Sequence, residues 1–469
     1  MSTNQIPQNK YLLFAVGAIG TFMATLDGSI LNVALPTISA DFSVAIDQIA
    51  WVAIAYSLTL ISLMLVFGVW VDKKGYYFAY RFGYVLFIIG STMCAFSSTF
   101  EFLIFSRIIQ AIGTAMFAAI GPGMVATVFG EKERGKGIGM MVMMVAGGFM
   151  VGPPLGGFLL HYFHWPALFM INIPIGCIGL IMTFIFFRHL PKPVLDRKLR
   201  IKGAVAISIA LLTTTLSMSE INSYPLSDIH IWGLGVVALL MYALFFYFES
   251  KPESAMIGLQ IFRNKQFTSS LGAMLFMFLA LSGISILIPF YLENIKGYAP
   301  SEVGIFLIIF PVMMFIFAPI SGRISDKIGY QFLTISGLLI LIFGMFFMSN
   351  LTVDSSQKFI IISFLLLGMG VGIFNTPNSS AFMGSVTEEF RAVTSSILGT
   401  TRNIGMSVGV ALSTALFTYF QTQNSYLGDK GLIFVTSYKT VIYVSIGITS
   451  IALLFSFMRG QKNAVEKSE

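Results

Sequence analysis

The sequence Gly68-Val-Trp-Val-Asp72-Lys-Lys-Gly75 recurs 254 residues later as Gly322-Arg-Ile-Ser-Asp326-Lys-Ile-Gly329. Each copy follows a long apolar run and brings glycines, an aspartate and basic residues to the point where that run ends. The pattern predicts a tight turn between two helices, in which the aspartate caps a helix amino terminus or pairs with a neighbouring base. Simple turn formation would explain a single copy. Two copies at matching places predict a chain built from two similar halves.

The composition is that of an integral membrane protein. Of the 469 residues, 56% are hydrophobic and only 10% are charged, and the mean hydropathy is +0.84. A soluble domain carries roughly 25% charged residues. Apolar runs of about 20 residues recur along the chain, which predicts membrane-spanning helices and not barrel strands. The net charge of +7 comes from basic residues scattered through short loops, so nucleic-acid binding is not indicated.

Apolar runs bounded by charges and turn residues predict fourteen transmembrane helices. They lie at 11–35, 49–71, 79–99, 102–129, 137–160, 166–188, 203–219, 230–248, 268–292, 302–320, 331–349, 358–380, 394–420 and 435–458. We expect a six-helix bundle in residues 1–188, a basic linker with two extra helices in 189–267, and a second six-helix bundle in 268–469. The expected fold is therefore all-α and integral to the membrane.

The distribution of Lys and Arg predicts that both termini are cytoplasmic. With the amino terminus inside, 22 of the 28 basic residues fall on the inner side, and positively charged loops are retained in the cytoplasm. Four fall on the outer side: Lys296, Lys358, Lys430 and Lys439. We expect Lys198 and the carboxyl tail inside, Asp228 and Asp429 outside, and the protein in the cytoplasmic membrane. The repeated loops then lie on the cytoplasmic side, where they would act as a conformational latch.

Asp27 lies inside the first apolar run, in the segment Thr25-Leu-Asp27-Gly-Ser-Ile-Leu-Asn32-Val-Ala-Leu-Pro36. An ionised aspartate at the centre of a membrane helix costs roughly 2.5 to 3.5 kcal/mol on insertion scales. Such a residue normally faces a polar cavity and takes part in transport or proton handling. The alternative is a neutral, hydrogen-bonded aspartate that only ties helices together.

Two arginines also fall inside predicted spans, and an intramembrane arginine is almost always paired or facing water. Arg107 would hold Asp27 or a chain of water molecules, or it would be tethered to backbone carbonyls. Arg402 is followed by Gly405 and Gly409, a spacing typical of close helix packing, so we assign it a structural role.

The fifth apolar run contains Gly148-Phe-Met-Val-Gly152-Pro153-Pro154-Leu-Gly156-Gly157. Small residues four apart let another helix approach closely, and prolines bend a helix. Ordinary helix packing explains the glycines by themselves. Their combination with two adjacent prolines favours a specialised gating helix.

These motifs resemble those of the major facilitator superfamily, and in particular of its fourteen-span drug:proton antiporter branch. Gly68 to Gly75 is similar to the signature loop of the superfamily, and Gly148 to Gly157 to the antiporter motif. Leu103-Ile-Phe-Ser-Arg107-Ile-Ile-Gln110-Ala-Ile-Gly113 resembles its fourth-helix motif, and Leu26 to Pro36 the first-helix motif of the branch. The resemblance implies that Asp27 and Arg107 belong to the proton-coupling machinery. Departures from the family pattern are Tyr76, Tyr77 and Ala111.

The function that we expect from these features is proton-driven efflux. A Gly-x-x-x-x-Gly-Lys-Ser/Thr phosphate loop is absent, so an ion gradient is expected to supply the energy. Asp27 is the acid placed well inside a span, which favours amphipathic drugs and toxic compounds that are monocationic or neutral. One alternative is export of a native metabolite, lipid or siderophore on the same fold. Another is a membrane sensor or scaffold that transports nothing.

Neither catalysis nor metal binding is expected. The spans lack the cluster of carboxylates, His or Cys that an enzyme would need. His161 and His164 lie at a span end without a third ligand, and Cys94 and Cys177 share no close-spaced motif. We predict no cofactor. The expected partners are a small-molecule substrate, protons and the lipid bilayer, and the oligomeric state is left open.

Overall fold

The computed structural model describes residues 10–44, 46–49, 51–188, 201–220, 229–251, 255 and 259–459. Predictions for the linker around Lys198, for Asp228 and for the tail after Arg459 lie outside these residues. Within the described residues, the regular secondary structure is helical throughout, as predicted.

The helices follow one another along the chain with short connections. The first half of the sequence forms α1 (Lys10–Phe42), α2 (Ile46–Ile49), α3 (Trp51–Lys74), α4 (Tyr76–Ala95), α5 (Phe100–Ala118), α6 (Gly121–Phe129), α7 (Arg134–Tyr162), α8 (Ala167–Met170), α9 (Asn172–Met182) and η1 (Thr183–Phe187). The central part forms α10 (Ile201–Glu220), α11 (Ile229–Ser250) and η2 (Leu259–Arg263). The second half forms α12 (Lys265–Phe290), η3 (Tyr291–Ile295), α13 (Pro300–Ile328), α14 (Gln331–Ser349), α15 (Gln357–Met383), η4 (Glu388–Phe390), α16 (Arg391–Gln423), η5 (Asn424–Leu427) and α17 (Lys430–Met458).

Helices cover all fourteen of the predicted apolar runs. Among the described residues, thirteen helical segments are long and apolar enough to cross a membrane. The predicted seventh span coincides with α10, whose apolar part, Ile201–Ser217, is shorter than these thirteen. The structure therefore supports a multi-pass membrane fold, and the count of fourteen spans is not established.

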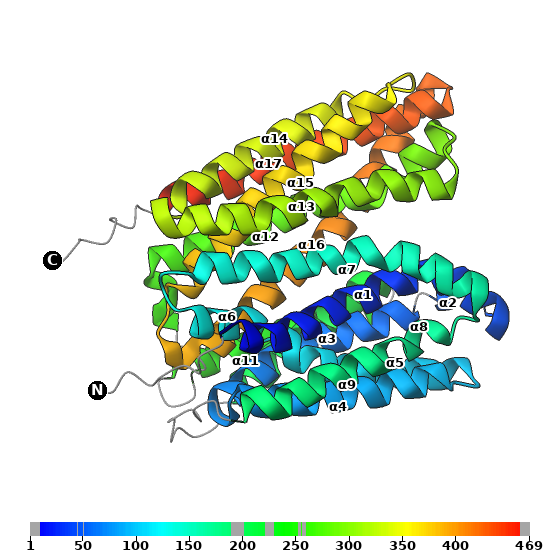
Figure 1. Cartoon of the computed structure of the whole chain (residues 1–469). Helices are drawn as coiled ribbons and strands as arrows, with labels where there is room; N and C mark the ends of the chain where they lie inside the picture. Colours follow the sequence, from blue (N-terminus) through cyan, green and yellow to red (C-terminus); the bar gives the residue numbers. More distant parts are fainter. Residues whose placement is uncertain are drawn as a thin grey trace. The chain divides into compact units, whose positions relative to one another are not determined.

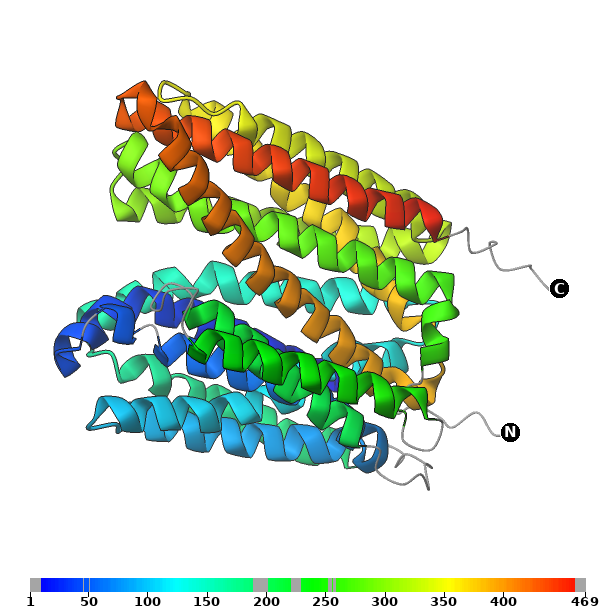
Figure 2. The same cartoon turned by 180° about the vertical axis from the view of Figure 1, so that it is seen from behind.

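The chain divides into two compact units. Unit 1 comprises Met1–Glu131, Gly147–Ile261 and Val386–Thr400, and unit 2 comprises Lys132–Ala146, Phe262–Ser385 and Thr401–Glu469. Two helices, α7 and α16, contribute residues to both units. The central helices α10 and α11 belong to unit 1. Within unit 1 they lie side by side (Figure 2), and α10 packs on α3.

Glycines allow the helices of each unit to approach closely. In unit 1, α4 packs on α5, and a Cβ atom added at Gly113 would lie 2.5 Å from the backbone nitrogen of Phe87. In unit 2, α15 packs against both α13 and α14 (Figure 1). A Cβ atom at Gly370 would lie 2.7 Å from the backbone nitrogen of Leu341. These contacts fix the rotation of α5 and α15 about their axes, because a larger residue would not fit.

A polar cluster joins the ends of four helices in unit 2. Tyr330 donates a hydrogen bond to Gln266 Oε1 at 2.9 Å, and Gln266 donates to the carbonyl of Ala381 at 2.6 Å. Arg459, which is 4% exposed, donates to Asn378 Oδ1. Burial lowers the pKa of Arg459 to about 10 and raises the pKa of Tyr330. The cluster ties the starts of α12 and α14 to the ends of α15 and α17.

Candidate functional site

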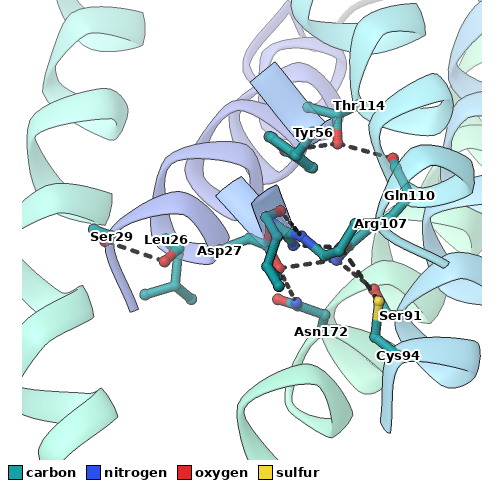
Figure 3. Close-up of polar contacts among 11 residues, drawn as sticks. Leu26, Asp27, Ser29, Tyr56, Ser91, Cys94, Arg107, Gln110, Thr114 and Asn172 are labelled. Atoms are coloured by element: carbon teal, nitrogen blue, oxygen red, sulfur yellow. Dashed lines mark hydrogen bonds and ion pairs between the residues drawn. The ribbon is translucent and has the colours of Figure 1, made fainter. Parts of the chain in front are cut away.

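Asp27 lies near the middle of α1 and is only 1% exposed. Three side chains donate hydrogen bonds to its carboxylate (Figure 3). Arg107 Nη1 lies 2.6 Å from Oδ2, and Gln110 Nε2 and Asn172 Nδ2 each lie 2.8 Å from Oδ1. The first of these three contacts is also an ion pair. Both oxygens of Asp27 are therefore bound by side chains of unit 1.

Arg107 comes from α5 and is also 1% exposed. Besides Asp27, its Nη1 donates to Gln110 Oε1 at 2.5 Å, and its Nε donates to the carbonyl of Val52 at 3.4 Å. Its guanidinium carbon lies 4.2 Å from the centre of the Tyr56 ring, a cation–π contact. The two interpretations of Arg107 thus combine, because it holds Asp27 and also contacts a backbone carbonyl.

A wider polar network surrounds the ion pair in the middle of unit 1. Gln110 Nε2 also contacts Ser91 Oγ at 2.9 Å, and Tyr56 donates to Thr114 Oγ1 at 3.0 Å (Figure 3). Gln110 was not predicted as a site residue, although it follows Arg107 by three positions and so shares its helix face. Asn172 was missed as well, and its only sign in the sequence is a polar residue early in an apolar run.

The charges of this site cancel as long as Asp27 is ionised. Removing one partner of a buried ion pair costs about 3 to 5 kcal/mol, because the other charge is left uncompensated. A proton that binds Asp27 would likewise leave the charge of Arg107 uncompensated. Protonation of Asp27 would therefore act on α1, α5 and α9, the three helices that supply Asp27, Arg107 and Asn172. No group of three potential metal ligands occurs among the described residues.

The glycines of α7 pack against α1 on both sides of Asp27. A Cβ atom at Gly148 would overlap Thr25 Oγ1, and one at Gly152 would overlap Ser29 Oγ. At Gly156 it would lie 3.0 Å from Ile30 Cγ1. Ser29 Oγ also donates a hydrogen bond to the carbonyl of Gly148 at 3.1 Å.

The remaining residues of the predicted gating motif differ from Gly148, Gly152 and Gly156 in their surroundings. A Cβ atom at Gly157 would meet nothing within 4 Å, so this glycine takes no part in the contact with α1. Pro153 and Pro154 lie inside α7, which continues through both of them to Tyr162. The three glycines four residues apart are thus the part of the motif that meets the helix carrying Asp27.

The two aspartates of the repeated loop each cap the start of a helix. Asp72 accepts hydrogen bonds from the backbone N–H groups of Ala392 and Val393, both at 3.1 Å, at the start of α16. Asp326 accepts them from Gly135 at 2.7 Å and from Lys136 at 2.8 Å, at the start of α7. A negative charge at a helix amino terminus is favourable, since it satisfies free N–H groups and opposes the helix dipole.

The glycines of the two loop copies also have matching roles. Gly75 and Gly329 end α3 and α13 with φ angles of 88° and 86°, a conformation that glycine adopts without strain. A Cβ atom at Gly68 would overlap Ser396 of α16, and one at Gly322 would overlap the Gly135 carbonyl of α7. The repeat in the sequence is therefore a repeat of local structure.

Arg402 is the second arginine inside a predicted span. It lies eleven residues after the start of α16, which is about 16 Å at 1.5 Å per residue. It is partly exposed, and no hydrogen bond or ion pair links it to any residue that the structure describes. A charged side chain at this depth costs roughly 2.5 to 3.5 kcal/mol on insertion scales when it is not compensated. The close packing expected after Arg402 is present at Gly405 and Gly409, which lie against α12, but Arg402 itself makes no polar contact with a described residue.

Comparison with known proteins identifies the family. The model of the Major Facilitator Superfamily matches residues 17–410 and 270–467, which covers most of the chain. The chain belongs to the major facilitator superfamily. It is therefore a membrane transporter, and its relatives are transporters and not enzymes. The fourteen-span branch of the family remains a prediction.

Two relatives and one solved structure show the range of this similarity. The chain is 34% identical over 454 residues to the riboflavin transporter RibZ of Clostridioides difficile, which covers 96% of the chain and 98% of that protein. It is 28% identical over 443 residues to multidrug resistance protein 3 of Bacillus subtilis, which covers 92% and 85%. The proton:xylose symporter XylE has the same fold, with a TM-score of 0.67, 15% identity, and coverage of 97% and 96%.

Proposed function

We propose that this transporter exports amphipathic small molecules in exchange for protons, with Asp27 as the proton-coupling residue. The observation that carries the proposal is the buried Asp27–Arg107 ion pair with its two amide donors, Gln110 and Asn172. Asp27 joins α1 to α5 and α9, so its protonation removes the negative charge that three side chains of these helices contact. Arg107 then has no counter-charge, and a new arrangement of these helices becomes favourable.

The geometry of the site favours a different substrate class from the one expected from the sequence. The expected preference for a monocation required a free carboxylate to offset its charge. Here the Asp27 carboxylate is 1% exposed and accepts from three donors. A cation that replaced Arg107 would leave that guanidinium buried and unpaired. The proposed substrates are therefore neutral or negatively charged amphipathic compounds.

A dedicated exporter or importer of one metabolite is the second candidate. It is favoured by the 34% identity to a protein named as a riboflavin transporter, which extends over 98% of that protein. Multidrug resistance proteins among the other relatives favour the broader substrate range. Competition between riboflavin and a panel of aromatic drugs for transport separates the two, because a dedicated transporter would accept flavins alone.

Conformational control is proposed to lie in the two loops and in α7. Asp72 and Asp326 would act as paired latches, because each binds the start of a helix from the other half of the sequence. Gly148 and Gly152 would let α7 slide or tilt along the turn of α1 that carries Asp27. Protonation of Asp27 and movement of α7 would then be coupled through one helix.

Proton coupling can be tested with the full-length transporter in proteoliposomes. Wild-type protein should release protons when a substrate is added and should move the substrate in response to a pH gradient. Asp27→Asn imitates the protonated form and should lose gradient-driven transport. The matched control is Asp41→Asn, an exposed acid on the same helix that accepts from Trp165 Nε1 at 2.7 Å. Normal gradient-driven transport by Asp27→Asn would refute the assignment.

A further inference from the structure

No described residue of unit 2 neutralises the charge of Arg402. Its guanidinium has no hydrogen bond or ion pair to any described residue. The acids of this unit that the structure describes all lie at helix ends or between helices: Glu133, Glu293, Glu302, Asp326, Asp354 and Asp429. Arginine keeps its proton in proteins, so it cannot escape the cost of burial by becoming neutral. Arg402 is therefore a fixed positive charge in the middle of α16.

The packing of α16 indicates what the exposed part of the Arg402 side chain faces. Gly405, Gly409 and Ser413 form one stripe of α16 against α12. A Cβ atom at Gly405 would lie 2.8 Å from the Leu275 carbonyl. Arg402 lies one turn before Gly405 on nearly the same side of the helix. An arginine that turned its charge to lipid at this depth would be strongly disfavoured, so its exposed part faces water or a solute.

The two intramembrane arginines thus differ in kind. Arg107 is 1% exposed, and Asp27 compensates its charge. Arg402 is partly exposed and uncompensated. With Asp27 ionised, these three mid-span groups carry a net charge of +1, and that charge is at Arg402. An organic anion is the ligand that would supply the missing negative charge.

We propose that Arg402 binds the negatively charged group of the transported compound, which makes amphipathic organic carboxylates the preferred substrate class. The planar guanidinium presents parallel N–H donors that match the two oxygens of a carboxylate. Phe278, whose Cβ would lie 3.1 Å from a Cβ at Gly405, places an aromatic residue one turn away on α12. This inference rests on the proposed export function for its biological meaning, but binding by Arg402 can be measured without transport.

The test uses one naphthalene body that bears a carboxylate, a hydroxymethyl or an ammonium group at the same position. Binding of each compound to purified full-length protein is measured by equilibrium dialysis. The variants are Arg402→Gln, which removes the charge, and Arg402→Lys, which keeps the charge without the planar fork. Arg263→Gln, an exposed arginine of the same unit, is the matched control.

We expect wild-type protein to bind the carboxylate at least about tenfold more tightly than the ammonium compound. A hydrogen bond to a charged group corresponds to a factor of roughly 10 to 100 in affinity, so Arg402→Gln should weaken carboxylate binding by that factor. The same variant should leave binding of the alcohol within about twofold of wild type. The affinity of Arg402→Lys for the carboxylate should lie between those of wild type and Arg402→Gln. Arg263→Gln should bind all three compounds as wild type does.

Three results would overturn the assignment: equal binding of the three compounds, failure to bind the carboxylate, or preference for the ammonium compound. Equal weakening of all three by Arg402→Gln would show a structural role instead. If that variant does not yield monodisperse protein, the ratio of carboxylate to alcohol binding in Arg402→Lys decides the question. Proteoliposomes with a pH gradient test the export function separately. Carboxylate binding that depends on Arg402 without gradient-driven movement would refute the export function and keep the binding site.

Discussion

The contact between α7 and α1 predicts different effects for two glycines that are five residues apart. A Cβ atom at Gly152 would overlap Ser29 Oγ, lie 2.8 Å from Ser29 Cβ and lie 3.2 Å from the backbone nitrogen of Ile30. A Cβ atom at Gly157 would meet nothing within 4 Å. We therefore expect Gly152→Ala to impair transport and Gly157→Ala to leave it intact.

The expected difference in free energy between Gly152→Ala and Gly157→Ala follows from two opposing contributions. Alanine is more favourable than glycine inside a helix by about 1 kcal/mol, and both variants gain this contribution. Overpacking of a tight contact costs about 1 to 3 kcal/mol, and only Gly152→Ala carries that cost. A difference of this size changes the population of the packed arrangement by roughly 5- to 150-fold. Gly152→Leu should have a larger effect, because its side chain cannot be accommodated by a small shift of Ser29.

The assay compares initial rates of gradient-driven transport in proteoliposomes, with equal amounts of inserted protein. The thermal stability of each purified variant shows whether the protein has simply unfolded. Gly152→Ala should be inserted and folded but several-fold slower than Gly157→Ala. Equal rates for the two variants would show that the close approach of α7 and α1 plays no part in transport.

Three further predictions concern other parts of the chain. Asn172→Leu should lower gradient-driven transport by about tenfold or more, because the Asp27 carboxylate loses one of its three donors; substrate-induced proton release measures this. Asp72→Ala and Asp326→Ala should each destabilise the helix start that they cap by about 0.5 to 2 kcal/mol, and their effects on thermal stability should add, because the two caps lie in different units. A cysteine at position 429 should be labelled by an impermeant reagent from outside intact cells, and labelling from inside alone would reverse the topology.

Much of the fold could be predicted from local features of the sequence. Apolar runs of sufficient length predicted the helices, because a segment in lipid must satisfy its own backbone hydrogen bonds. The glycines at 75 and 329 predicted turns, and the structure shows both with positive φ angles. Asp27 and Arg107 stood out because charges are rare in apolar runs. Each of these features depends on residues that are neighbours in the chain.

Only the tertiary structure shows which side chains meet across helices. Gln110 and Asn172 contact Asp27 from positions 83 and 145 residues away along the chain. Gly156 and Gly157 are adjacent in the sequence, yet one faces α1 and the other faces open space. Arg107 pairs with an acid, whereas Arg402 forms an ion pair with none of the residues that the structure describes. These outcomes depend on how each helix is rotated against its neighbours, and that rotation is set by close packing over the whole unit and not by the sequence of any single helix.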